Sequence, residues 1–370
     1  MASRTLLEPG RETRRREAAA RAPASTPPRP HRRGILAGPI VAAFTLVVGF
    51  IATDAADVPL RDPDHVAALY FVLVGFGVAL LVGLDVAVRA GRRTGTRRPS
   101  REAMRQVRRE RWTPARSVAV GTALLSFYLT YMAYRNLKAI VPLLRPGDLV
   151  DRQLADLDRA MFAGHDPADL LHSVLGVGIS THFLAIAYAA FIVFLPLSLA
   201  VALVFARDIR AGLFYATGLS VNWVLGAASY FLLPSLGPIY YEPEAFAHLP
   251  YSEVTRLQDM LLDQRVEFLA HPTTALPQAI AAFASLHISM SLTAAIAAHL
   301  LGLGRRLKIV LWVWLALTVL STVYFGWHYF LDDIAGVAIA AGALLAARAL
   351  TGIDLRALRV TPRAAQPPAD

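Results

Sequence analysis

The stretch SVLGVGISTHFLAIAYAAFIVFLPLSLAVALVFA, residues 173–206, decides the class of fold. It contains no Asp, Glu, Lys or Arg, and His182 is its one side chain that could carry a proton charge. A helix that crosses a bilayer needs about 20 consecutive apolar residues, each adding about 1.5 Å of rise. The stretch therefore predicts a membrane-spanning helix.

Seven further apolar runs lie on either side of this stretch. They cover residues 35–53, 66–84, 117–134, 211–241, 276–304, 309–325 and 334–347. The run at 117–134 can continue as a helix towards residue 144. The last run reaches spanning length only if it includes His328, Asp332 and Asp333. We therefore predict an all-α fold, a polytopic membrane bundle of about eight transmembrane helices.

The composition supports this class. Hydrophobic residues make up 55% of the 370 residues and charged residues only 17%, yet the net charge is +10. An ordinary soluble domain has roughly 25% charged residues. Such an apolar chain can carry this much positive charge if the apolar residues and the charges occupy different segments, as in a membrane protein with several spans. The composition therefore argues against a soluble enzyme and against a disordered chain. The chain has no cysteine, which excludes disulfides and thiolate metal sites.

Arginines gather in alternate connecting segments, which predicts the orientation. Nine lie in residues 1–33 and eleven in 89–116, and others follow in 207–210, 304–308 and 348–363. With eight spans, all five segments fall on one side, which the positive-inside rule makes cytoplasmic. Both termini are then cytoplasmic. We interpret residues 1–33 as a disordered basic tail that holds topology rather than as a nucleic-acid-binding segment.

Residues 147–172 lie between the third and fourth runs, on the opposite side. Leu149, Leu154, Leu157 and Met161 recur at helical spacing among acidic residues. This pattern predicts an amphipathic helix that lies on the outer membrane interface.

Two cations lie near the outer boundary, after the run at 117–134. Lys138 and Arg145 bracket six uncharged residues, and Pro146 follows. Together an ammonium and a planar guanidinium suit a phosphate. The alternative is a snorkelling lysine and an interfacial arginine that ends a helix. Lysine is rare here, since 35 of the 37 basic residues are arginine and only Lys138 and Lys308 are lysine.

Two histidines lie near the outer ends of predicted spans. Ser285 and His287 lie near the outer start of the run at 276–304, where His287 could donate a proton to a leaving oxygen or bond a neighbouring helix. His328 and Asp332 are four residues apart, so on a helix they share a face. The carboxylate can accept from Nδ1–H of the imidazole, which leaves Nε2 as a base or nucleophile. A salt bridge or a proton relay is the alternative.

A metal site is another interpretation of these side chains. His287, His328, Asp332 and Asp333 could form a site with two histidines and carboxylates. No local HxxxH or HExxH spacing supports it, and Lys138 and Arg145 would repel a metal ion. We therefore expect no metal.

Three groups of residues follow one another along the chain: Lys138 to Pro146, Ser285 with His287, and Ser321 to Asp332. In this order they resemble the signature of the type 2 phosphatidic acid phosphatase superfamily. Its pattern is KxxxxxxRP, then PSGH, then SRxxxxxHxxxD. The first motif is complete, and the third has its spacing from Ser321 through His328 to Asp332. The resemblance covers roughly residues 117–350 and implies a six-span core.

Three positions depart from the pattern. Ala284 and Leu286 replace the proline and glycine of the second motif, and Thr322 replaces the arginine of the third. The resulting SLH and ST…HYxxD are similar to the branch that contains inositol phosphorylceramide synthases and bacterial inositolphosphotransferase-like proteins. The segment PSLGPIYY, residues 234–241, also resembles that branch. A helix terminus rich in proline and glycine, with interfacial tyrosines, is its other interpretation.

The resemblance implies a role for each site residue. His328 would be the nucleophile, His287 the general acid and base, and Asp332 the group that orients His328. Phosphate would be bound by Lys138, Arg145 and Ser285, with Arg135 as a candidate extra cation. No metal or other cofactor is implied.

The expected function is therefore an integral-membrane lipid phosphatase or phosphotransferase. It would act at the extracytoplasmic face on a lipid-linked phosphate through a phosphohistidine, with water, a small polyol or a lipid as acceptor. Transfer of an inositol-phosphate type head group, simple hydrolysis of phosphatidate or of a polyprenyl diphosphate, and a transporter or scaffold all stay open. The expected partners are the lipid substrate and the bilayer, not nucleic acid.

The expected organisation has five parts along the chain. They are the tail 1–33, two extra transmembrane helices at 34–89, an Arg-rich cytoplasmic loop at 90–116, the six-span core at 117–350 and a cytoplasmic tail at 351–370.

Overall fold

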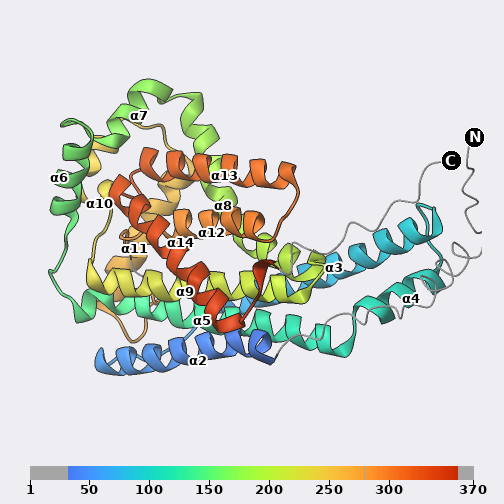
Figure 1. The fold of residues 1–370 in the computed structure, drawn as a ribbon. Coiled ribbons are helices and arrows are strands. Elements are labelled where there is room, and N and C mark those ends of the chain that lie inside the picture. The colour runs from blue at the N-terminus through green and yellow to red at the C-terminus, as the bar shows by residue number, and fades with distance from the viewer. Residues whose placement is uncertain (1–31, 279, 357–370) are drawn as a thin grey trace, which may run out of the picture.

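A computed structural model describes residues 32–278 and 280–356, and throughout these ranges the chain is helical, with no strand. The helices form one bundle (Figure 1). The predicted all-α, polytopic bundle is therefore confirmed. The expected tails fall almost wholly on residues 1–31 and 357–370, which lie outside the described residues.

Long helices make up the body of the bundle. They are α2 (Arg32–Ala55), α3 (Val66–Thr94), α5 (Pro114–Leu144), α8 (Ile179–Phe205), α9 (Ile209–Leu232), α12 (Leu286–Leu300), α13 (Arg305–Tyr324) and α14 (Phe330–Thr351). Within the described residues, six of these are long and apolar enough to cross a membrane, and α9 and α12 are the two that are not. The chain thus has the features of a multi-pass membrane protein.

Shorter helices cover the two ends of the bundle. At one end lie α6 (Asp151–Met161), α7 (Pro167–Leu175), α10 (Pro238–Tyr241), the 3-10 helix η1 (Pro243–Phe246) and α11 (Glu253–Ala270), and at the other lies α4 (Arg101–Arg111) (Figure 1). The two ends therefore carry different segments of the chain, and the end with α6 and α11 is called the α6 end below.

Helix α9 runs through the middle of the bundle. It packs against α2, α5, α8, α12 and α14, and most of its residues are buried. Because it has little contact with the outside, it can carry polar groups. Asn222, for example, donates from Nδ2 to the Thr293 hydroxyl of α12 at 3.0 Å. A helix shielded by its neighbours does not need the all-round apolar surface that a lipid-facing helix needs.

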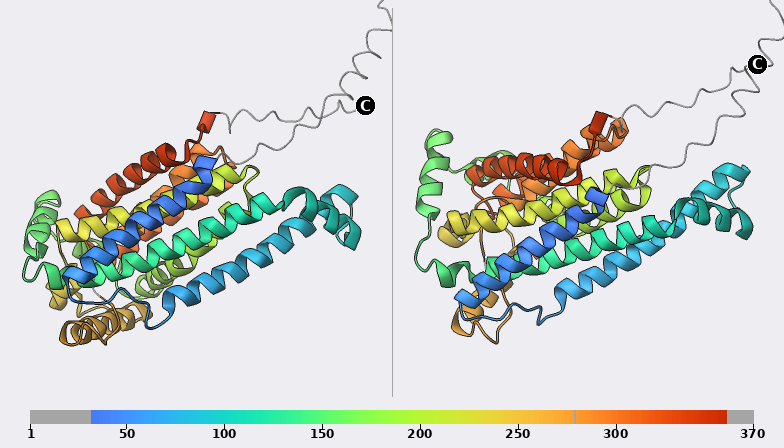
Figure 2. Two further views of the ribbon diagram at one scale, coloured as in Figure 1. Left: turned by 90° about the horizontal axis from the view of Figure 1, so that it is seen from below. Right: turned by 60° about the horizontal axis from the view of Figure 1, so that its bottom comes forward.

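The two N-terminal spans belong to the same bundle. Helix α2 packs along α5 and also contacts α9 and α14, and α3 packs against α5 and α8 (Figure 2). The segment predicted as extra transmembrane helices therefore buries its surface against the remainder of the chain.

Several predicted span boundaries were wrong, for local reasons. The run at 173–206 is interrupted at Gly176, whose φ is 71°: residues 173–175 belong to α7, and α8 begins only at Ile179. The run at 211–241 stops at Leu232, two residues before Pro234. The run at 276–304 becomes helical only at Leu286. Residues 282 and 283 instead donate their N–H groups to Ser235.

One boundary prediction was correct and one was correct in part. Helix α5 continues without a break to Leu144. Helix α14 begins at Phe330, so it includes Asp332 and Asp333, but His328, which the predicted span also included, lies two residues before it. The acidic residues therefore form part of the first turn of the last span, where their negative charge is favourable.

Arginines bind the end of the bundle that lies away from the α6 end. Arg111 and Arg116 donate to the carbonyl of Val204 at 3.0 and 3.1 Å, and Arg116 also donates to that of Leu203 at 3.2 Å. These carbonyls belong to the last turn of α8, where a cation is favourable. The Arg-rich segment 90–116 thus folds against the C-terminal end of α8.

We predict that Gly226→Ala destabilises the bundle. A Cβ at Gly226 would lie 2.6 to 2.8 Å from three side-chain carbons of Leu286, the residue that replaces the family glycine. Overpacking of this kind costs about 1–3 kcal/mol, so the melting temperature in detergent should fall by several degrees. Gly121→Ala, which places its Cβ in open space on α5, is the matched control. Equal melting temperatures for the two variants would contradict the prediction.

Candidate active site

His328 and Asp332 lie side by side at the start of α14. The distance from His328 Nδ1 to Asp332 Oδ2 is 3.3 Å, and the same oxygen accepts the Tyr329 N–H at 3.0 Å. Both side chains are buried, and Asp332 is fully so. With Asp332 ionised, Nδ1 of His328 carries the proton, because a carboxylate can only accept. That leaves Nε2 without a proton.

His287 lies opposite this nitrogen. Its Nδ1 is 3.2 Å from His328 Nε2, although the two residues are 41 positions apart in the chain. The ring also packs against Tyr188 and Phe191 of α8, at centroid distances of 5.1 and 4.5 Å. The three side chains Asp332, His328 and His287 therefore form one hydrogen-bonded row.

Ser285 begins α12 as its N-cap residue. Its hydroxyl accepts the Ile288 N–H, and its own N–H donates to the Asp332 carbonyl at 3.0 Å. Ser285 is fully buried, and a Cβ added at Gly336 would lie 2.6 Å from its carbonyl oxygen. In the structure Ser285 therefore joins the starts of α12 and α14, which carry His287 and Asp332.

Thr322 stands where the family pattern has an arginine. It is fully buried, and its hydroxyl donates to the Thr318 carbonyl of its own helix at 2.9 Å. A neutral side chain, whose hydroxyl makes its hydrogen bond within α13, therefore occupies this position.

Lys138 lines the same cavity as the two histidines. It projects from α5, with its Nζ 5.9 Å from the centre of the Tyr230 ring. In the described ranges Lys138 has no ion pair within 4 Å. A cation and the histidine row therefore face one space.

Arg135 also lines this cavity, one turn before Lys138. Its guanidinium contacts Asp62 and Asp64 of the α2–α3 loop at 2.9 and 2.7 Å. Two carboxylates thus already neutralise the charge that was expected as an extra phosphate ligand.

Arg145 lies apart from the histidines. It is the C-cap of α5, its Nε contacts Asp148 at 2.7 Å, and it donates to the Phe231 carbonyl. It does not occur among the described residues that line the cavity. Lys138, His287 and His328 therefore line one cavity, whereas Arg145 and Ser285 are not among its described lining residues.

The shared cavity has a volume of about 530 Å³, within the range of roughly 300–1,000 Å³ typical of ligand sites. One end holds Arg135, Lys138, His287 and His328. Apart from Asp64, Gln264 and Gln278, most of the other lining residues are aromatic and aliphatic side chains of α3, α5, α8, α9 and α11. The shape thus joins a polar end to an apolar body.

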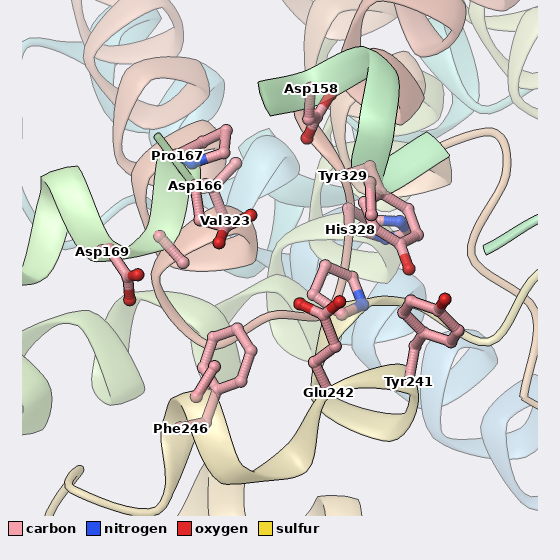
Figure 3. A pocket seen from close by; sticks show the side chains of 14 residues that line it. Asp158, Asp166, Pro167, Asp169, Tyr241, Glu242, Phe246, Val323, His328 and Tyr329 are labelled. Atoms are coloured by element: carbon pink, nitrogen blue, oxygen red, sulfur yellow. The ribbon is translucent and has the colours of Figure 1, made fainter. Parts of the chain in front are cut away.

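A second, much smaller pocket touches His328 from another direction. It measures about 30 Å³, enough for about one water molecule. Figure 3 shows the carboxylates of Asp158, Asp166 and Glu242 near His328 and Tyr329. His328 therefore borders both an amphiphilic cavity and a small acidic pocket.

Two acidic residues of α6, which were not predicted as site residues, bind the segment between His328 and Asp332. Asp158 accepts the backbone N–H groups of Phe330 and Leu331 at the start of α14. Asp151 accepts from Gly237 N–H at 2.9 Å and from the Tyr329 hydroxyl at 3.1 Å. Burial raises the pKa of both carboxyl groups, and the N–H donors oppose that rise.

Residues 147–172 were expected to form one amphipathic helix, and they form two helices, α6 and α7. The polar face of α6 turns Asp151 and Asp158 inward, while Leu157 and Met161 are exposed. The position of this segment on the outer membrane interface remains a prediction. The signal available in the sequence was the seven-residue spacing of the two aspartates, which puts them on one face.

Among the described residues, no group of three or more His, Cys, Asp or Glu side chains could hold a metal ion. Lys138 faces the same cavity as the two histidines, and its ammonium would repel a divalent cation placed there.

Comparison with known proteins gives the family. The model of the PAP2 superfamily matches residues 152–346, just over half of the chain. The match includes His287, His328 and Asp332, and Lys138 and Arg145 precede it. No curated protein and no solved structure matches the chain. Since the matched part carries the histidine row and most of the bundle around it, the chain belongs to the PAP2 superfamily.

Proposed function

We propose that the protein is a membrane phosphatase or phosphotransferase that acts on a lipid-linked phosphate through a phosphohistidine. The observation that carries the proposal is the row Asp332–His328–His287, which opens on a cavity that also holds the Lys138 ammonium. A nucleophile, an acid and a cation around one space are the groups that phosphoryl transfer needs.

The first chemical step follows from the hydrogen bonds. His328 Nε2 attacks phosphorus, and the bond from phosphorus to the alkoxy oxygen breaks. His287 shares a hydrogen with Nε2 at 3.2 Å. Because Nε2 lacks a proton, this hydrogen lies on His287 Nδ1. In its protonated, imidazolium form His287 gives this proton to the leaving oxygen and becomes a neutral imidazole. The products are phosphohistidine and a free alcohol.

The second step reverses these roles. His287, now without that proton, takes one from water or from an alcohol, whose oxygen attacks the phosphohistidine. The nitrogen–phosphorus bond breaks, and His328 is restored with Asp332 still holding Nδ1. Water gives free phosphate, and an alcohol gives a new phosphate ester. Lys138 stabilises the negative charge on the phosphoryl oxygens in both steps.

We infer an extracytoplasmic site from the two ends of the bundle. His287 packs against Tyr188 and Phe191 in the middle of α8, nine and twelve residues after its start, whereas the Arg-rich segment binds Leu203 and Val204 in its last turn. Fifteen residues of helix, about 22 Å, separate Tyr188 from Leu203. If the arginines are cytoplasmic, the histidines lie at the other face.

A second candidate is transfer to an alcohol acceptor, of the inositolphosphotransferase kind. The observation in its favour is that Leu286 and Thr322 stand at two of the three departures from the family pattern, as in the branch that the sequence resembles. Purified protein with phosphate-labelled lipid, with and without myo-inositol, separates the two. Free phosphate alone indicates a phosphatase, and label on inositol indicates a transferase. Release of label by neither route would contradict both.

We predict that Asp158→Ala lowers kcat for a lipid phosphate by about 10²-fold with little change in KM. The first N–H groups of α14 then lose their acceptor, and a small shift of the reacting nitrogen has an effect of that size. Asp158→Asn, which keeps one acceptor oxygen, should recover part of the rate. Asp156→Ala is the matched control, since Asp156 is exposed on the same helix. Similar rates in the two alanine variants would refute the positioning role.

A further inference from the structure

Helix α3 forms one wall of the large cavity. Phe71 and Val74 line it, and Val78, one turn further along, is buried in the core. The opposite face of the helix, with Val72, Phe76 and Leu80, is exposed. Helix α3 precedes the family match at 152–346, so this wall is supplied by a part of the chain outside that match.

The cavity has the proportions of a single lipid chain. On α5 its lining runs from Lys138 back to Leu124, which is fourteen residues or about 21 Å of helix. Half of the hydrocarbon thickness of a bilayer is about 15 Å. At the depth of Leu124 the walls include Leu195 and Leu199 of α8. A phosphate held at Lys138 would therefore have an apolar slot behind it as long as a hydrocarbon tail.

The α2–α3 loop is fixed to the rim of this slot. Asp62 and Asp64 hold Arg135, and the backbone of Arg61 exchanges hydrogen bonds with the Asn136 side chain at 3.0 and 2.9 Å. The Arg61 guanidinium also donates to the Pro272 carbonyl at 3.1 Å. Asp62 accepts the Ala68 N–H in the first turn of α3. The start of α3 is thus tied to α5 next to Lys138.

We propose that α3 is the specificity-determining wall for the lipid. One hydrocarbon chain of the lipid phosphate lies between α3, α5 and α8, with its phosphate at Lys138 and the histidine row. This inference rests on the proposed function for the position of the phosphate. It assigns to α3, the second span, the selection of the substrate's chain through Phe71 and Val74.

The test compares two substitutions on one helix. Val74→Trp fills the slot, and Val72→Trp puts the same side chain on the outer face, where Val72 is 63% exposed. The substrates are hexadecyl phosphate and hexyl phosphate in detergent. We expect Val74→Trp to lower the ratio of kcat/KM for the long chain over the short chain by about tenfold. Val72→Trp should leave this ratio unchanged.

A photoreactive hexadecyl phosphate, with a diazirine near the chain end, gives a readout that does not depend on turnover. We expect crosslinks on the inner face of α3 that Val74→Trp removes and Val72→Trp keeps. An unchanged ratio together with no inner-face crosslink overturns the inference, even where phosphate is released. Crosslinks with no phosphate released would instead contradict the proposed function.

Discussion

Replacing His328 by alanine is expected to reduce lipid-phosphate turnover by at least about 10⁴-fold. The substitution removes the imidazole whose Nδ1 lies 3.3 Å from Asp332 Oδ2 and whose Nε2, the proposed nucleophile, lies 3.2 Å from His287 Nδ1. Loss of a nucleophile that acts with its base as a unit has effects of this order. The measurement is release of labelled phosphate from a lipid phosphate by purified protein.

The control for this variant is His182→Ala. His182 is an exposed histidine of α8, and its loss should leave turnover unchanged. Equal amounts of purified protein with equal melting temperatures exclude misfolding as the cause. A His328→Ala protein that retains more than about one hundredth of the activity would exclude His328 as the nucleophile.

Replacing Lys138 by methionine is expected to lower kcat/KM by about 10²- to 10³-fold. Arg135 is paired with Asp62 and Asp64, and Arg145 is bound to Asp148, so Lys138 is left to face the phosphate. Removing one group that stabilises charge in the transition state costs this much. Methionine keeps the length of the side chain, so the packing beside Tyr230 is retained.

Lys308→Met is the matched control, because Lys308 is the second of the two lysines and lies in the first turn of α13. It should leave kcat/KM unchanged. If both variants behave alike, Lys138 is not the phosphate ligand, and Arg135 would have to exchange its aspartates for the substrate. In that case Asp64→Asn, which loosens Arg135, should raise the kcat/KM of the Lys138→Met protein.

Much of the fold was predictable because its signal is local. A long uncharged run such as residues 117–134 has few structural options, and α5 extends to Leu144 as expected. The ends of helices were harder. The segment before Leu286 is apolar enough for a span, yet Ser235 binds its backbone N–H groups. Such a tertiary contact, made across about fifty residues, leaves no periodic trace in the sequence.

The candidate site divides in the same way. The pairing of His328 with Asp332 follows from their spacing of four residues and is present in the structure. The spacing of Lys138 and Arg145 suggested one phosphate site, but α5 ends at Arg145, which turns to Asp148. The phosphate-binding role of Arg145 remains a prediction. The seven-residue interval fixes a shared face only while the helix continues.

The contacts that support the site could not be read from the sequence. Asp158 reaches the start of α14 across 172 positions, and Asp62 reaches Arg135 across 73. Asp158 lies in a segment that was expected to be an interfacial helix, and Asp62 lies in a short segment between two spans, so neither was singled out as a site residue. Their inward direction depends on how α6 and the α2–α3 loop pack against the bundle, which only the assembled fold determines.

Trapping the phosphorylated protein tests the central claim most directly. Purified protein is mixed with lipid phosphate labelled on phosphorus, quenched rapidly in denaturant at alkaline pH, and digested for mass spectrometry. The account predicts label on the peptide that contains His328, in a bond that acid breaks, and no label in the His328→Ala protein. Label on another residue, or continuous turnover with no phosphorus bound to the protein at any quench time, would contradict it.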